Sequence, residues 1–138
     1  MDEKVKKELK DSLDEMFPWA DHCIKELGKI PAISMTFTQV KMGLRPLRGV
    51  VARFPWAEER DREEKVRNLS KGASEVNAIA AGVMMEVDGK LALSVRMVDG
   101  DCFAKSAPLL KEEGKLVGIG EVQSDEELKR IIPAWGDS

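Results

Sequence analysis

Two aspartates near the middle of the second half, Asp99 and Asp101, flank a single glycine, and a third, Asp88, precedes Gly89. Paired carboxylates can hold Mg²⁺ or carry out acid–base chemistry. Asp88 and Asp99 fall at opposite ends of one predicted strand, so only Asp99 and Asp101 could share a ligand. Asp beside Gly is also the usual composition of a tight turn. We favour the turn and predict no metal site here.

The histidine and the cysteines do not form a nucleophilic or zinc-binding pattern. The chain has one histidine, His22, which is followed directly by Cys23; the other cysteine, Cys102, is far away in sequence. Neighbouring residues on a helix point about 100° apart, so His22 and Cys23 cannot converge as a base and a nucleophile. We therefore predict no catalytic residues and no cofactor, and an enzyme is the less favoured class.

A basic stretch is the strongest asymmetry of the sequence. No acidic residue occurs between Glu26 and Glu58. A predicted hairpin over 41–53 should therefore carry positive charge, which suits an acidic protein surface, a phosphate backbone or the acidic helices of the same fold. The net charge of −3 argues against a nucleic-acid-binding domain, so we favour a protein partner. The predicted partner-binding residues are Lys41, Arg45, Arg48 and Arg53.

Composition indicates one folded domain over 1–138. Of 138 residues, 43% are hydrophobic, which is enough to bury a core. The first residues are charged and lack the apolar centre of a signal peptide, and the longest apolar run, 78–85, is far too short to cross a membrane. Two isolated cysteines are typical of a reducing compartment. We expect a cytoplasmic protein with no membrane association.

Residues 1–29 are predicted to form a helical N-terminal arm. Apolar residues recur every three or four positions and Pro18 interrupts them, so we expect a kinked helix or a second helix that starts at Pro18 and ends at Gly28. The sequence Phe-Pro-Trp-Ala occurs at 17–20 and again at 54–57, and we interpret it as a helix start used twice. The predicted apolar stripe consists of Val5, Leu9, Leu13, Met16, Ala20, Ile24 and Leu27.

The rest of the chain alternates between strand and turn patterns. Strands are predicted over 33–38 and 50–54, with a turn at 43–46, and a charged helix follows over 55–71. Further strands are predicted over 78–87, 90–97, 101–107 and 115–122, joined by Asp-Gly and Glu-Gly turns. A capping box at 124–127 predicts a short helix over 125–132 that Pro133 ends. The predicted fold is α+β: an antiparallel sheet of about five or six strands, with helices at the N-terminus, in the middle and at the C-terminus.

The strand over 78–87 is apolar on both faces, which a small domain has few helices to cover. An open face bearing Ala78, Ala80, Gly82 and Met84 would be a patch that monomers seldom tolerate. We therefore expect a homodimer or a tight partner. The N-terminal stripe either packs on its own sheet or joins this interface, and the candidate interface residues are Leu9, Leu13, Met16 and Met84.

Together these patterns favour a small soluble interaction or regulatory protein that acts through a protein-binding surface. One alternative is a nucleotide- or phosphate-handling enzyme that uses the hairpin-tip aspartates with Arg45. Another is a nucleic-acid-associated factor that uses the basic hairpin 41–53.

Overall fold

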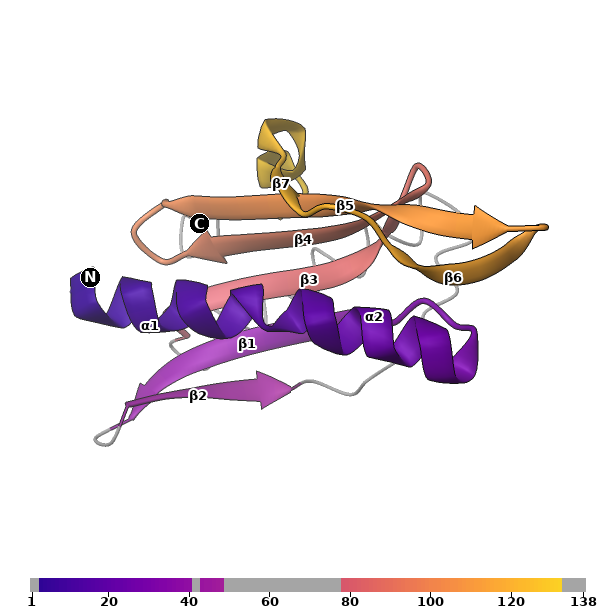
Figure 1. The fold of residues 1–138 in the computed structure, drawn as a ribbon. Coiled ribbons are helices and arrows are strands. Elements are labelled where there is room, and N and C mark those ends of the chain that lie inside the picture. The colour runs from indigo at the N-terminus through magenta and orange to yellow at the C-terminus, as the bar shows by residue number, and fades with distance from the viewer. Residues whose placement is uncertain (1–2, 41–42, 49–77, 133–138) are drawn as a thin grey trace.

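The computed structural model describes residues 3–40, 43–48 and 78–132 (Figure 1). The predicted strand over 50–54, the second Phe-Pro-Trp-Ala, the charged helix over 55–71 and Pro133 lie outside these residues. So do Lys41 and Arg53.

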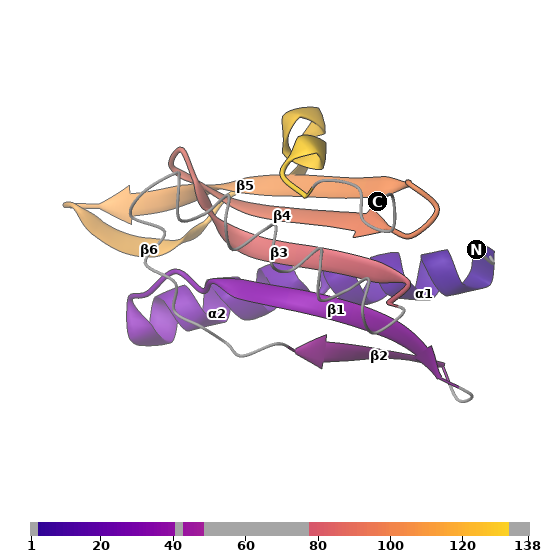
Figure 2. The same ribbon diagram turned by 180° about the vertical axis from the view of Figure 1, so that it is seen from behind.

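The described residues form an α+β fold in which two helices cross one face of an antiparallel sheet (Figure 1). The sheet has the order β2-β1-β3-β4-β5-β6, and a short β7 pairs with β5. Seen from behind, the strands stand in front of both helices (Figure 2). The elements are α1 (Glu3–Asp14), α2 (Met16–Leu27), β1 (Ile33–Val40), β2 (Gly43–Arg48), β3 (Ala80–Val87), β4 (Lys90–Met97), β5 (Cys102–Glu112), β6 (Lys115–Ile119), β7 (Gln123–Ser124) and the 3₁₀ helix η1 (Glu126–Arg130).

The predicted kink of the N-terminal arm is confirmed. α1 ends at Asp14 and α2 begins at Met16, two residues before the proline. Pro18 has no N–H to donate to Asp14, and the N–H of Trp19 reaches the carbonyl of Glu15 only at 3.4 Å. Phe-Pro-Trp-Ala therefore occupies the first turn of α2, where proline is tolerated. Gly28 ends the helix at φ 63°, as predicted.

The first hairpin differs from its prediction. Residues 43–46 were expected to form its turn, but they belong to β2, which pairs with β1 from Arg48 opposite Met35 to Gly43 opposite Val40. Pro46 is compatible with this strand because it lies opposite Phe37, whose carbonyl accepts a hydrogen bond from the N–H of Ile79 on the β3 side. The bonding groups of β1 face away from Pro46 there, so the missing N–H costs no bond of the β1–β2 ladder.

The remaining strands follow one another as a meander, as predicted. Asp88 and Gly89 both have positive φ, 49° and 81°, and Glu113 and Gly114 repeat this at 51° and 78°. Positive φ at both turn residues is the signature of the two-residue turn that matches strand twist. β5 is longer than predicted: its first part pairs with β4 and its end pairs with β6.

The core lies between the helices and the sheet, and a smaller apolar layer covers the other face. Leu9, Leu13 and Phe17 from the helices pack in one cluster with alternate residues of the central strands, such as Met84 and Leu93. The intervening residues of these strands point to the other face of the sheet, where Val83 and Met85 pack with Ile132. The prediction of a strand buried on both faces is therefore confirmed for β3.

The C-terminal helix is shorter than predicted and differs in type. η1 is a single 3₁₀ segment, and its first flanking residue is Asp125, which makes no side-chain capping bond. The predicted capping box at Ser124 is wrong, since Ser124 belongs to β7 and the carboxylate of Asp125 bonds elsewhere.

Candidate partner-binding surfaces

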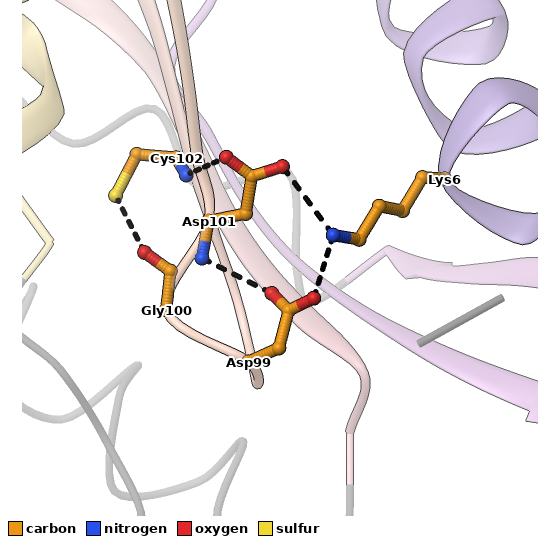
Figure 3. Close-up of polar contacts among 5 residues, drawn as sticks. All are labelled: Lys6, Asp99, Gly100, Asp101 and Cys102. Carbon is orange, nitrogen blue, oxygen red and sulfur yellow. Dashed lines mark hydrogen bonds and ion pairs between the residues drawn. The ribbon is translucent and has the colours of Figure 1, made fainter. Parts of the chain in front are cut away.

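The aspartates of the β4–β5 turn form a closed polar cluster with α1 (Figure 3). Asp99 accepts a hydrogen bond from the N–H of Asp101 at 3.0 Å, and Asp101 accepts one from the N–H of Cys102 at 3.0 Å. The Nζ atom of Lys6 lies 2.7 Å from Asp99 and 3.6 Å from Asp101. The cation between the two carboxylates is thus a lysine of the same chain.

The pKa shifts in this cluster arise from hydrogen bonds within the chain, as in a contact that stabilises the fold. The bond from Lys6 is the main cause that lowers the pKa of Asp99, with a further contribution from the N–H of Asp101. The same bond raises the pKa of Lys6. Within 3–40, 43–48 and 78–132 no group of three or more His, Cys, Asp or Glu side chains could hold a metal ion.

The other charged residues near the sheet surface also bond within the chain. Lys105 forms an ion pair of 2.7 Å with Asp14 of α1. Asp125 accepts hydrogen bonds from Lys90 at 2.7 Å and from the hydroxyl of Ser106 at 2.9 Å. The Lys90 bond is the largest influence that lowers the pKa of Asp125. This partly buried cluster attaches η1 to the sheet.

η1 is also held through its carbonyl oxygens. Ser94 donates to the carbonyl of Leu128 at 2.6 Å. Arg96 donates to the carbonyls of Ile132 at 2.6 Å and Lys129 at 3.2 Å. A cation beside the last carbonyls of a helical segment satisfies groups that the helix leaves unbonded. Arg96 therefore helps to hold η1 and the residues after it on the sheet.

α2 is attached to β6 by a carboxylate in the middle of the helix. Asp21 accepts a hydrogen bond from the N–H of Ile119 at 3.0 Å and pairs with Lys25 at 2.7 Å. Both contacts lower the pKa of Asp21, the Lys25 bond more strongly. Gly118, at φ 154°, makes this approach possible, because a Cβ atom there would lie 2.6 Å from the Asp21 carboxylate.

The histidine and the cysteines lie on two separate elements of the fold. His22 is exposed, Cys23 is half-buried on the same helix, and Cys102 lies at the β4–β5 turn, where its thiol donates to the carbonyl of Gly100 at 3.5 Å. The sulfur atoms are free thiols.

Three of the four candidate interface residues lie inside the chain's own core. Leu9 and Met84 are 0% exposed and Leu13 is 1% exposed, while Met16 is half-buried against the same cluster. The face of β3 that was expected to be open is covered by α1 and α2. Leu9, Leu13 and Met84 are therefore not accessible to another molecule.

Two of the four predicted basic residues are placed by the structure. Arg45 and Arg48 both belong to β2, the outermost strand at one side of the described sheet. We call the β2 strand with these two arginines the basic edge. Arg45 is three strands away from β4, so it belongs to a different part of the sheet from Asp99 and Asp101.

The sequence reasoning missed an exposed apolar row on α2. Trp19 is 37% and Leu27 is 64% exposed, although Leu27 was assigned to the buried stripe. Half-buried Cys23 lies between them at the same four-residue spacing. We call Trp19, Cys23 and Leu27 the α2 row. On a helical wheel Leu27 lies only about 20° from buried Ala20, so the periodicity of the sequence could not separate it from the buried side of α2.

No family model, curated protein or solved structure matches this chain. Among the described residues, no helix is both long enough and apolar enough to span a membrane.

Proposed function

We propose that this chain is a non-catalytic interaction protein that binds an acidic protein partner at the basic edge. The observation that carries the proposal is the position of Arg45 and Arg48 on β2, the outermost strand of the described sheet. An edge strand is the part of a sheet that another molecule can approach along its full length.

Charge distribution supports the choice of an acidic partner. The interval between Glu26 and Glu58 carries five basic residues and no acidic one, a charge of +5, and the chain as a whole carries −3. The rest of the chain therefore carries −8, from −3 minus +5. Opposite charge on a partner would direct it to the basic interval and away from the remainder.

The polar contacts favour this function over the catalytic alternative. A phosphate-handling enzyme would need Asp99 and Asp101 free to meet a substrate or a metal ion. Both carboxylates are instead bonded to Lys6 and to backbone N–H groups. A nucleic-acid-associated factor remains the alternative use of the same basic edge.

Pro46 determines how the partner approaches. It lies in the middle of β2, where it leaves a gap in the outward row of N–H donors. Proline on an edge strand opposes the addition of a further strand. The proposed contact is therefore through the arginine side chains and not through a continued β-ladder.

The test is site-specific photo-crosslinking in the cells that produce the protein. A crosslinking residue replaces Leu47, between the two arginines, and in the control it replaces exposed Leu110 on β5. We expect a discrete protein adduct at position 47 and none at position 110. Adducts with nucleic acid alone would contradict the proposal.

A charge-reversal pair then tests the recovered partner. Arg45→Glu with Arg48→Glu should weaken its binding by roughly tenfold or more, and the binding should fall as salt rises. Lys111→Glu with Lys115→Glu changes the net charge equally on two exposed residues of the β5–β6 hairpin and should leave the affinity unchanged. Equal losses in both double variants would refute a specific basic edge.

A further inference from the structure

The α2 row is a regular apolar line on the outside of the molecule. Trp19, Cys23 and Leu27 are spaced by four residues, so they lie along one side of α2 over about 12 Å. Trp19 and Leu27 are two of the four large apolar side chains exposed within the described residues. Exposed apolar residues that line up in this way are typical of a contact surface.

The other sides of α2 are already occupied by the chain itself. Phe17, Ala20 and Ile24 are buried against the sheet. Asp21 and Lys25 face β6, where Asp21 holds the N–H of Ile119 and Lys25 pairs with Asp21. The α2 row and the polar residues beside it form the side that remains for an external molecule.

The polar residues beside the row carry charges that would meet opposite charges if a second copy of the helix lay antiparallel to the first. Along the chain they are acidic Glu15, His22, acidic Glu26 and basic Lys29, and all four are exposed. Within the described residues none of these four forms an ion pair. In an antiparallel copy, Glu15, which directly precedes α2, would lie near Lys29, which follows Gly28 at the other end of the helix, and this pair of opposite charges would occur twice.

We propose that α2 binds α2 of a second copy of this chain, antiparallel, around a two-fold axis that passes close to Cys23. Trp19 of each copy then packs against Leu27 of the other, and the two Cys23 side chains face each other at the axis. A closed two-fold pair is the commonest symmetric assembly. The proposal goes beyond the basic edge and does not depend on it.

The short length of the α2 row limits the surface area that the proposed dimer can bury. One helix face of this length is smaller than the surface that stable complexes bury, which is roughly 800 Å² for each partner. We therefore expect a weak and reversible dimer.

Sedimentation velocity of the full chain, from low micromolar to near-millimolar concentration, tests the surface. The wild type should shift from monomer to dimer, and Leu27→Glu should stay monomeric. Leu110→Glu places the same charge on the exposed leucine of β5 and should dimerise like the wild type. A monomer throughout, or dimerisation that Leu27→Glu leaves intact, would overturn the proposal.

A charge exchange tests the antiparallel arrangement. Glu15→Lys should weaken the dimer by roughly tenfold, because it replaces two attractive contacts with two repulsive ones. Adding Lys29→Glu should restore the wild-type dissociation constant. The two residues are at opposite ends of α2, about 20 Å apart, so they cannot restore each other within one copy. Failure of the second change to restore the dimer would refute the pairing and indicate another occupant.

Cysteine crosslinking tests the position of the axis. In a Cys102→Ser chain, a short bis-maleimide should join two copies through Cys23, and Leu27→Glu should abolish the product. The converse variant, Cys23→Ser with Cys102 retained, should give no dimer. A covalent dimer through Cys102 alone would contradict the proposed axis. These results are independent of Arg45 and Arg48, so either proposal can fail without the other.

Discussion

At the scale of single residues, Gly82 of β3 lies where the side chains of both neighbouring strands leave no room for a Cβ atom. A Cβ atom there would lie 2.8 Å from Cγ2 of Val95 on β4 and 3.3 Å from Cε of Met35 on β1. Real Cβ atoms do not tolerate the first distance, so one methyl group would force the strands or the valine to move. The glycine is needed for packing and not for a special backbone angle.

We predict that Gly82→Ala lowers the free energy of unfolding by about 1–3 kcal/mol, because it overpacks the core. Urea denaturation measures this change. Val95→Ala removes the methyl group that the new Cβ would meet. In that background, Gly82→Ala should cost clearly less, and an equal cost in both backgrounds would contradict the steric explanation.

Residue type alone predicted which residues form the turns, but not which distant residues the turn residues contact. Asp99 beside Gly100 was correctly interpreted as turn chemistry, because the Asx bond to Asp101 is made two residues away. The bond to Lys6 joins positions 93 apart in sequence, from 99 minus 6, and only the fold brings them together. Likewise nothing in the sequence around Asp21 indicates that it would hold the backbone of β6.

At the scale of elements, two lysines attach α1 to the sheet: Lys6 of α1 pairs with Asp99, and Lys105 of β5 pairs with Asp14 at the end of α1. Lys6 is 15% exposed and reaches across to the β4–β5 turn, whereas Lys7 is 79% exposed and pairs only with Asp11 of the same helix. These neighbours have the same charge and the same helix propensity. Replacing each lysine in turn therefore distinguishes the effect of a contact between two elements from the effect of a contact within one helix.

We predict that Lys6→Met lowers the free energy of unfolding and speeds amide hydrogen exchange in the first turns of α1. Lys7→Met should change stability by only a few tenths of a kcal/mol, as expected for an exposed helical pair. Hydrogen exchange followed by mass spectrometry measures both. Similar exchange in the two variants would mean that the Lys6–Asp99 contact does not help to hold the first turns of α1.

Periodic elements were predictable from the sequence, and elements defined by distant contacts were not. The stripe of α1, the strand over 90–97 and the Asp88-Gly89 turn each carry their signal within a few residues, and all three are confirmed. The start of β2 was missed because Gly43 and Pro46 resemble a turn, and their place in a strand depends on pairing with β1. The 3₁₀ form of η1 was missed because Asp125 is recruited by Lys90 instead of capping the helix.

At the scale of the whole molecule, three aspartates join separate parts of the chain to the sheet. Asp21 joins α2 to β6, Asp99 joins the β4–β5 turn to α1, and Asp125 joins η1 to β4 and β5. In each case a lysine hydrogen bond is the leading cause that lowers the pKa of the carboxyl group. All three contacts therefore depend on the same protonation state.

We predict that acid weakens the fold through these carboxylates. A group whose pKa is lower in the folded chain stabilises it fully above its ordinary value, near 3.9, and this stabilisation is lost as the pH falls through the lowered pKa. The free energy of unfolding should thus decrease from about pH 5 downward. Urea denaturation between about pH 6 and pH 3 measures the decrease. Asp125→Asn should be less stable at neutral pH and should lose less on acidification, and an unchanged slope would exclude Asp125 as a contributor.

Among the strands that the structure describes, β1 and β3 are the paired neighbours farthest apart in sequence, since Phe37 lies opposite Ala80. Closing a loop of this length costs roughly 2–3 kcal/mol more chain entropy than closing a two-residue turn. The β3–β4 and β5–β6 hairpins pay only the smaller cost. The meander can therefore assemble early in folding. β1, β2 and the two helices are added only when β1 pairs with β3, which is a later step. The core is then completed by the N-terminal third of the chain, although that part leaves the ribosome first.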